Sequence, residues 1–136
     1  MLDIIKQSKQ WKESEVEAVL NTIVYAFHAL KIPGKTSIEL KLEKSNKQYE
    51  GLTLQQSLKK YEVRLFHNKD VVTLLATVLH EMVHVKQFRT GKLGYSPVLT
   101  WEDGTRENDT PYSKQPWEKE AYKLEGKLLK KMLTKA

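Results

Sequence analysis

Hydrophobic residues recur at helical spacing near the start of the chain. They lie three or four positions apart and therefore share one face of a helix: Val16, Val19, Leu20, Ile23, Phe27 and Leu30. Ser14 and Glu17 have the spacing of a capping box, in which each side chain satisfies a backbone donor at the helix start. Pro33 and Gly34 are typical of a helix end. The pattern predicts an amphipathic helix over residues 14–30.

Two later segments alternate hydrophobic and polar residues, as a half-buried strand requires. Residues 36–43 alternate strictly, and residues 61–67 do so again. The segment between them is ambiguous, although Leu52 and Leu54 hint at a short strand. No crossover helix separates these pieces, so the sequence predicts a small antiparallel sheet.

The longest run of hydrophobic positions lies between Asp70 and Gly91. Hydrophobic side chains there occupy nearly every side of a helix, which is typical of a helix buried at the centre of a domain. A segment rich in Gly, Pro, Ser, Thr, Asn and Asp follows, with one possible strand at residues 98–101. Pro116, a residue favoured in the first helical turn, begins a last helix that runs to about Leu133. This order predicts an α+β fold with an N-terminal helix, a small antiparallel sheet, a central helix and a C-terminal helix.

The composition narrows the class of protein. A chain of 136 residues with 40% hydrophobic residues is long enough to form one core, so we expect a single domain over residues 1–136. Cysteine is absent, which excludes disulfides and thiolate metal sites. No hydrophobic run approaches the length of a membrane span, and the first residues lack the features of a secretory signal. The sequence therefore predicts a cytoplasmic protein that does not contact a membrane.

The net charge is +6, from 23 Lys and Arg against 17 Asp and Glu. Most of the excess is lysine, which is spread along the chain and is denser near the C-terminus. Specific recognition of nucleic acids depends more on arginine and on stacking aromatic side chains. The charge therefore supports nucleic-acid binding only weakly, and a solvated surface is the simpler interpretation.

The central helix carries the sequence His80-Glu81-Met82-Val83-His84. Two histidines four positions apart lie one turn from each other on the same face, so both imidazoles can reach one metal ion. A glutamate next to the first histidine is placed to take a proton from water at that ion. The spacing predicts His80 and His84 as zinc ligands and Glu81 as a general base.

Polar residues form a stripe along this otherwise hydrophobic helix. Unpaired polar groups in a core cost about 1–3 kcal/mol each, so such a stripe needs partners. A water-filled cleft that contains a cation supplies them. The stripe comprises Thr73, Thr77, His80, Glu81, His84 and Gln87.

Catalytic zinc usually takes three protein ligands and keeps a fourth position open. No histidine follows His84, and the chain has no cysteine. The third ligand is then a carboxylate, an earlier histidine such as His67, or missing. The carboxylates of Glu118 and Glu120, at the start of the last helix, are the strongest downstream candidates.

Two motifs give the chain a resemblance to a known family. Residues 79–87 (LHEMVHVKQ) and residues 116–122 (PWEKEAY) resemble the small zincin-like metallopeptidases found often in phage and bacterial genomes, and among zincins the gluzincin class. The resemblance implies a minimal zincin-like fold whose C-terminal helix bears the third zinc ligand, a glutamate of the second motif. It implies His80 and His84 as the other ligands and Glu81 as catalytic base. It further implies hydrolysis of a protein or peptide substrate in a bacterial or phage-infected cell.

Helix geometry separates the two glutamates of the second motif. At about 100° per residue, the hydrophobic side of the last helix is centred near Ala121. Glu118 falls about 60° from that centre, inside the buried wedge, whereas Glu120 falls about 100° to the other side and outside it. Glu118 is therefore the predicted ligand and Glu120 the alternative. Glu125 shares the side of Glu118 and is expected to support the site or to be a ligand itself.

Two other functions stay open at this point. One is a binding or structural protein that keeps the zincin fold without turnover. The other is a DNA-associated protease similar to the SprT-like proteases, which act on proteins bound to DNA. The chain lacks the zinc ribbon and the third histidine of that family, so this resemblance is partial. Its phosphate-facing residues would be Lys119, Lys123, Lys127 and Lys130.

Four aromatic residues complete the expectations. Tyr95 and Tyr112 are candidates to donate a hydrogen bond to an oxyanion, with surface packing as the alternative for both. Trp101 and Trp117 are expected to pack the loop and the last helix against the core.

Overall fold

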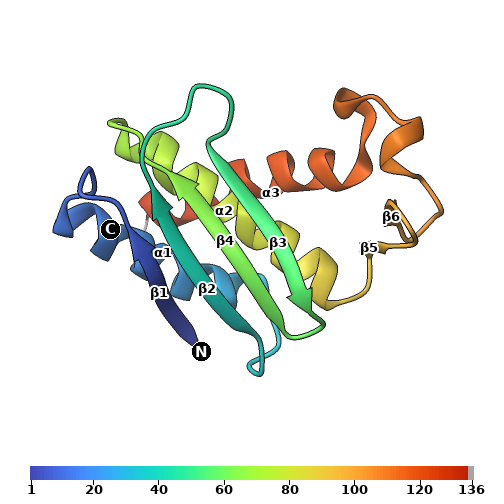
Figure 1. Ribbon diagram of the computed structural model, residues 1–136, viewed down its shortest axis with the longest axis horizontal. Helices are drawn as coiled ribbons and strands as arrows, with labels where there is room; N and C mark the ends of the chain where they lie inside the picture. The colour runs from blue at the N-terminus through green and yellow to red at the C-terminus, as the bar shows by residue number, and fades with distance from the viewer. Residues whose placement is uncertain (135–136) are drawn as a thin grey trace.

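The computed structural model describes residues 1–134, and within them the fold is α+β, with helices on one face of a four-stranded sheet (Figure 1). A two-stranded sheet and two 3-10 turns lie in the segment before the last helix. The elements are β1 (Leu2–Gln7), α1 (Glu13–Ala29), β2 (Ser37–Glu43), β3 (Gly51–Ser57), β4 (Lys60–Phe66), α2 (Val71–Arg89), β5 (Leu93–Tyr95), β6 (Leu99–Trp101), η1 (Glu107–Asp109), η2 (Tyr112–Lys114) and α3 (Pro116–Thr134).

The main sheet is mixed, and the predicted antiparallel sheet is wrong. Its strand order is β1-β2-β4-β3, in which β1 pairs in parallel with β2 and β2 pairs in parallel with β4. Only β3 is antiparallel to its neighbour, β4. Helix α1 supplies the crossover from β1 to β2. The loop after β2 carries the chain past β4 to the edge, and β4 then returns between β2 and β3 without a second crossover helix.

Helix α1 matches the predicted segment except at its start. Lys12 is the N-cap residue, and its backbone N–H donates to Glu15 Oε1 at 2.8 Å. Glu15 therefore makes the contact predicted for Glu17, and the predicted pairing of Ser14 with Glu17 is wrong by two residues. The reason is local, because either acidic residue fits the capping pattern of the sequence.

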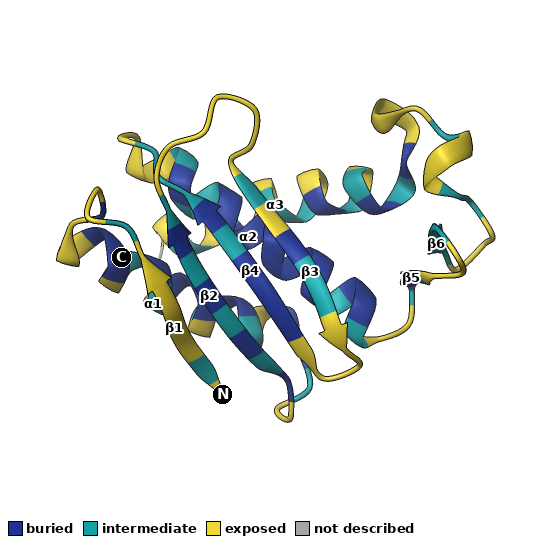
Figure 2. Cartoon of the chain, in the orientation of Figure 1, coloured by how far each residue is buried: buried dark blue, intermediate teal, exposed yellow. Residues whose placement is uncertain are grey.

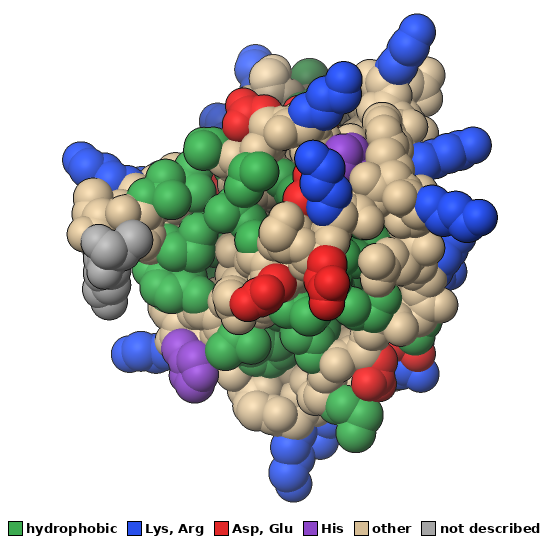
Figure 3. All heavy atoms as spheres, turned by 90° about the vertical axis from the view of Figure 1, so that its left-hand side faces the viewer, with side chains coloured by type: hydrophobic (Ala, Val, Ile, Leu, Met, Phe, Trp, Pro, Cys, Tyr) green, Lys and Arg blue, Asp and Glu red, His purple; other side chains and the backbone are tan. Residues whose placement is uncertain are grey.

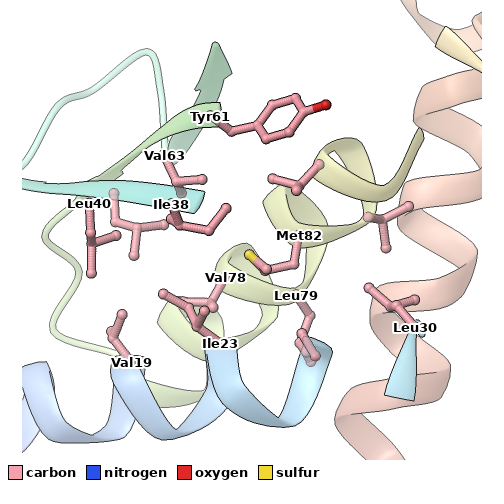
Figure 4. Packing of buried hydrophobic residues seen from close by; sticks show 14 of the residues in the cluster. Val19, Ile23, Leu30, Ile38, Leu40, Tyr61, Val63, Val78, Leu79 and Met82 are labelled. Atoms are coloured by element: carbon pink, nitrogen blue, oxygen red, sulfur yellow. The ribbon is translucent and has the colours of Figure 1, made fainter. Parts of the chain in front are cut away.

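The core lies between the sheet and the helices α1 and α2 (Figure 2). The alternating residues of β2 and β4 face inward, as the sequence predicted, and are almost fully buried. Helix α2 runs through the centre and contributes buried side chains on nearly all sides. Figure 4 shows side chains from both layers in contact, among them Val19, Ile23, Ile38, Leu40, Tyr61, Val63, Val78, Leu79 and Met82.

Helix α3 packs against α2 through one narrow face. Trp117, Ala121 and Leu128 are its buried residues. The predicted packing of Trp117 is confirmed, since it is 1% exposed, and Trp101 packs against the core while partly buried. No helix among residues 1–134 is long and hydrophobic enough to cross a membrane.

Candidate metal centre

Helix α2 brings the two histidines of the motif together. It begins at Asp70, whose side chain accepts the backbone N–H of Val72, and it stays regular through residue 89. His80 and His84 lie one turn apart with their Nε2 atoms 3.2 Å from each other. Both side chains are buried, although the helix is otherwise lined by hydrophobic residues. The spacing of the sequence motif thus produces the expected juxtaposition of two imidazoles.

Glu118 reaches the same point from the first turn of α3. Its Oε1 lies 2.9 Å from His80 Nε2 and 3.2 Å from His84 Nε2. Trp117, the residue before Glu118, is buried and anchors this turn of the helix against α2. Among residues 1–134, these three side chains form the group of donors that is compact enough to hold a metal ion.

The separations of these donors suit a small transition-metal ion. Nitrogen and oxygen ligands about 2.0–2.1 Å from a tetrahedral zinc ion lie roughly 3.3 Å from one another. The three observed separations are 2.9, 3.2 and 3.2 Å. Two imidazoles and one carboxylate are also a donor set that zinc accepts, and they leave one position open.

A second layer of contacts fixes which nitrogen of each histidine is available. His80 Nδ1 lies 2.7 Å from Glu125 Oε1, and since a carboxylate only accepts, Nδ1 carries the proton. The amide nitrogen of Gln87 donates to the Trp117 carbonyl at 3.0 Å, so its oxygen faces His84 Nδ1 at 2.8 Å and accepts from it. In the neutral form of both imidazoles, the Nε2 atoms are then left with lone pairs that point at Glu118, which is the form in which histidine binds metals.

Three acceptors that face one another repel unless a cation or protons lie among them. Burial alone would lower the pKa of His80, but hydrogen bonds to Glu118 and Glu125 outweigh burial and raise that pKa to about 9. Burial likewise opposes a charge on His84, yet Glu118 raises its pKa. Burial would raise the pKa of Glu118, but hydrogen bonds from the two histidines lower it to about 2. The three pKa shifts agree that positive charge is stabilised at the point where these side chains meet.

Glu120 and Glu125 lie one layer further out. Glu120 Oε1 accepts from the Gln87 amide at 3.1 Å, and its Oε2 lies 3.5 Å from Lys92 Nζ. The geometry therefore groups Glu118, and not Glu120, with the histidines, in agreement with the helical-wheel argument. Glu125 occupies the supporting position on His80 that the sequence suggested.

His67 lies elsewhere, although it was an alternative third ligand. Its Nε2 is 3.0 and 3.1 Å from the two carboxylate oxygens of Glu15, and its ring meets Trp11 edge-to-face at 5.2 Å between centroids. It is not among the grouped donors. The structure thus removes His67 from the candidate ligands.

Glu81 is buried beside the donor group and faces β3. Its Oε1 accepts a hydrogen bond of 2.6 Å from the hydroxyl of Thr53. Burial raises the pKa of the Glu81 carboxyl above its ordinary value. Sequence analysis did not single out Thr53, because its direction depends on which face of β3 meets α2.

A cleft runs past Glu81 on both sides. One part, of about 820 Å³, is mainly polar and is lined by the loop before β3 and by the first half of α2. The other part, of about 380 Å³, is lined by hydrophobic side chains that include Leu54, Leu93 and Leu99. His80 and Glu81 line both parts. The polar stripe of α2 from Thr73 to His84 thus borders a cleft, whereas Gln87, at its end, is buried and bonds to α3.

The two candidate tyrosines have different surroundings. Tyr112 lies at the edge of the donor group, with its Oη 3.4 Å from Glu118 Oε1 and 2.9 Å from Tyr122 Oη. Burial, followed by the contact with Tyr122, raises the pKa of the Tyr112 phenol, so that it stays a proton donor. Tyr95 stacks on Phe88 with 5.8 Å between ring centroids, at the border of the hydrophobic part of the cleft. Tyr112 is thus the better placed of the two.

Comparison of the chain with models of protein families finds no match, and comparison with curated proteins and with solved structures finds no significant similarity.

Proposed function

We propose that the protein is a zinc-dependent metallopeptidase that hydrolyses peptide bonds. The observation that carries the proposal is the convergence of His80 Nε2, His84 Nε2 and Glu118 Oε1 within 3.2 Å of one another, with the Glu81 carboxyl buried beside them. The zincin resemblance of the two motifs supports the same activity. A purely structural metal site has no use for a neighbouring base, which favours the enzyme over a non-catalytic binding protein.

Each residue has a defined part in the proposed reaction. His80, His84 and Glu118 would hold the zinc ion, which would act as a Lewis acid on the peptide carbonyl and on water. Glu81 takes a proton from the attacking water as the oxygen bonds to the carbonyl carbon. It then gives that proton to the amine nitrogen as the C–N bond breaks. The raised pKa of Glu81 suits a group that must both accept and return a proton.

Two further features support a polypeptide substrate. Within residues 1–134, strand β3 pairs with β4 alone, and its other edge could add an extended peptide along the cleft. Tyr112 lines both parts of the cleft, which supports a role for its hydroxyl as donor to the oxyanion that forms at the carbonyl.

A DNA-associated protease is the second candidate function. The observation in its favour is that Lys119, Lys123, Lys127 and Lys130 are all exposed on α3. On the face shown in Figure 3, basic side chains lie both at the outline and over the upper part, with acidic side chains among them. A steep loss of DNA affinity with rising salt would favour this candidate, and weak sticking to any polyanion would favour a solvated surface.

The proposal is tested by metal analysis and digestion of an unfolded protein. We expect about one zinc per chain and cleavage of unfolded casein that stops with a chelator and returns with zinc. Glu81→Gln should keep the zinc and lose turnover by about a hundredfold or more, because it removes the base alone. A zinc-loaded wild type that cleaves nothing across a broad panel of proteins and peptides contradicts the proposal and leaves a binding protein.

A further inference from the structure

Two residues of β3 face the Glu81 side chain. Gly51 and Thr53 are two positions apart, so a strand directs them to the same side, which here is the side of α2. The backbone of Gly51 comes so close to α2 that an added Cβ would lie 2.8 Å from Thr77 Cγ2 and 2.9 Å from Glu81 Cγ. The same Cβ would lie 3.0 Å from Glu81 Oε2. Only glycine permits this approach without a shift of β3 or α2.

Thr53 holds the other oxygen of the carboxyl group. Its hydroxyl lies 2.6 Å from Glu81 Oε1 and 3.2 Å from the Glu81 carbonyl oxygen. The hydroxyl has only one proton to donate. The carboxylate oxygen Oε1 is closer than the carbonyl oxygen and is the stronger acceptor, so it receives the hydrogen bond. Thr53 and Glu81 are both buried, so water competes little for this bond.

The two oxygens of Glu81 therefore have different environments. Oε1 is bound to Thr53, while Oε2 faces the position where Gly51 has no side chain. Gly51 and Glu81 line both parts of the cleft, so a side chain at position 51 would displace the Glu81 carboxyl at the cleft itself.

We infer that Gly51 and Thr53 are positioning residues for Glu81: Thr53 fixes Oε1, and Gly51, by having no side chain, lets the Glu81 carboxyl keep this position. The catalytic meaning of this pair rests on the proposed function, whereas the contact itself does not. A glutamate side chain turns about three bonds, and a general base works only within hydrogen-bond reach of its proton. A misplacement of about 1 Å can cost on the order of a hundredfold in rate.

The contact is tested first without any activity. In urea unfolding of the apo-protein, Thr53→Val should lower the midpoint, and Thr53→Ser should restore most of it because serine keeps the hydroxyl. The same Thr53→Val change in a Glu81→Met background should produce little further shift, since methionine has a similar length and lacks the carboxylate. Equal shifts in both backgrounds would mean that Thr53 does not hold Glu81.

Turnover of casein by zinc-loaded protein tests the positioning role. Thr53→Val and Gly51→Ala should keep the full zinc content and the KM, and should lose at least about tenfold in kcat. Thr53→Ser should stay within about twofold of the wild type. Thr22→Val and Gly34→Ala are matched controls, since Thr22 is buried and bonds to its own helix, and a Cβ on Gly34 meets nothing within 4 Å.

The outcomes separate this inference from the proposed function. If the wild type cleaves casein and both β3 variants keep their kcat, the positioning role is wrong and the proposed function stands. If both variants also lose zinc, their role is structural and the inference is again overturned. If the wild type binds no zinc and cleaves nothing, the proposed function fails, and the positioning role fails with it. The midpoints in urea then still decide whether Thr53 holds Glu81.

Discussion

Two buried clusters in this molecule combine histidine with glutamate, and they differ in how their hydrogen bonds are shared. In both, the glutamate lies near the start of a helix, Glu118 in α3 and Glu15 in α1. At the first cluster each imidazole gives its Nδ1 proton to a separate acceptor, so two Nε2 atoms converge on Glu118. At the second, His67 Nε2 meets both oxygens of Glu15, which also accepts the Lys12 N–H.

The comparison shows what distinguishes a candidate metal centre from a structural ion pair. Proximity of histidine and carboxylate is common to both clusters. In the cluster of His80, His84 and Glu118, however, there are more acceptor lone pairs than protons to fill them. The other cluster pairs one imidazole, His67, with one carboxylate, Glu15. The excess of acceptors depends on Glu125 and Gln87, which fix the tautomers from outside the donor group.

The largest expected effect comes from removing the imidazoles. The His80→Ala, His84→Ala double variant should lose its zinc, as measured by metal analysis after gel filtration. It should also lose the stability that zinc adds, about 4 kcal/mol when free zinc exceeds its dissociation constant a thousandfold. His67→Ala is the matched change in the second cluster, and it should keep full zinc occupancy. Loss of zinc from the single variant His67→Ala would contradict the distinction between the two clusters.

The next effect sharpens the assignment of the third donor. Glu118→Gln should weaken zinc binding by more than about a hundredfold, beyond the usual loss for a residue that only supports a ligand. Glu120→Gln is the control, because Glu120 contacts Gln87 and Lys92 instead. Competition with a chromogenic chelator gives both affinities. A large loss for Glu120→Gln with Glu118→Gln unchanged would show that the first turn of α3 is placed differently.

A smaller effect is expected one layer out. Glu125→Ala removes the acceptor of the His80 Nδ1 proton and should weaken zinc binding by about 10- to 100-fold while the metal can still bind. Lys127→Ala, an exposed change two residues on, should leave the affinity unchanged. If Glu125→Ala has no effect, the tautomer of His80 is not controlled from α3.

The smallest effect concerns the second cluster and its response to acid. Burial would raise the pKa of Glu15, but the Lys12 N–H and His67 outweigh it and lower that pKa below its ordinary value of 4.5. The folded state therefore binds this proton less readily than the unfolded state, and Glu15 stabilises the fold above about pH 4.5. Glu15→Gln should cost about 1 kcal/mol at pH 7. This difference should shrink as the pH falls below 4.5, and a constant difference in urea unfolding would contradict the pairing.

The features of the donor group that depend on a single helix could be predicted from short-range patterns in the sequence. The imidazoles of His80 and His84 meet because four residues make about one turn, and the phase of α3 favours Glu118 over Glu120. No hydrophobic pattern pointed to β1, since Leu2 alone is partly buried there and the rest of the strand is exposed. Its parallel partner lies more than thirty residues away, and such pairing leaves no local pattern.

The contacts that hold Glu81 could not be predicted for a similar reason. Gly51 and Thr53 are ordinary residues in a polar segment, and only the packing of β3 on α2 gives them a role. The pairing of Glu15 with His67 is likewise set by tertiary structure, across 52 positions of the chain. Long-range partners of a motif, unlike its spacing, depend on the fold as a whole.

The donor group also joins two distant positions of the chain. His84 and Glu118 are 34 residues apart, and the segment between α2 and α3 contains only two three-residue strands and two 3-10 turns. An ion shared by these residues would close the segment into a loop, as a disulfide would, and would remove conformational entropy from its open form. The availability of zinc would then determine how long residues 90–115, which border the cleft, stay folded. In the metal-free protein the amide hydrogens of this segment would exchange faster, and well before those of β2 and β4.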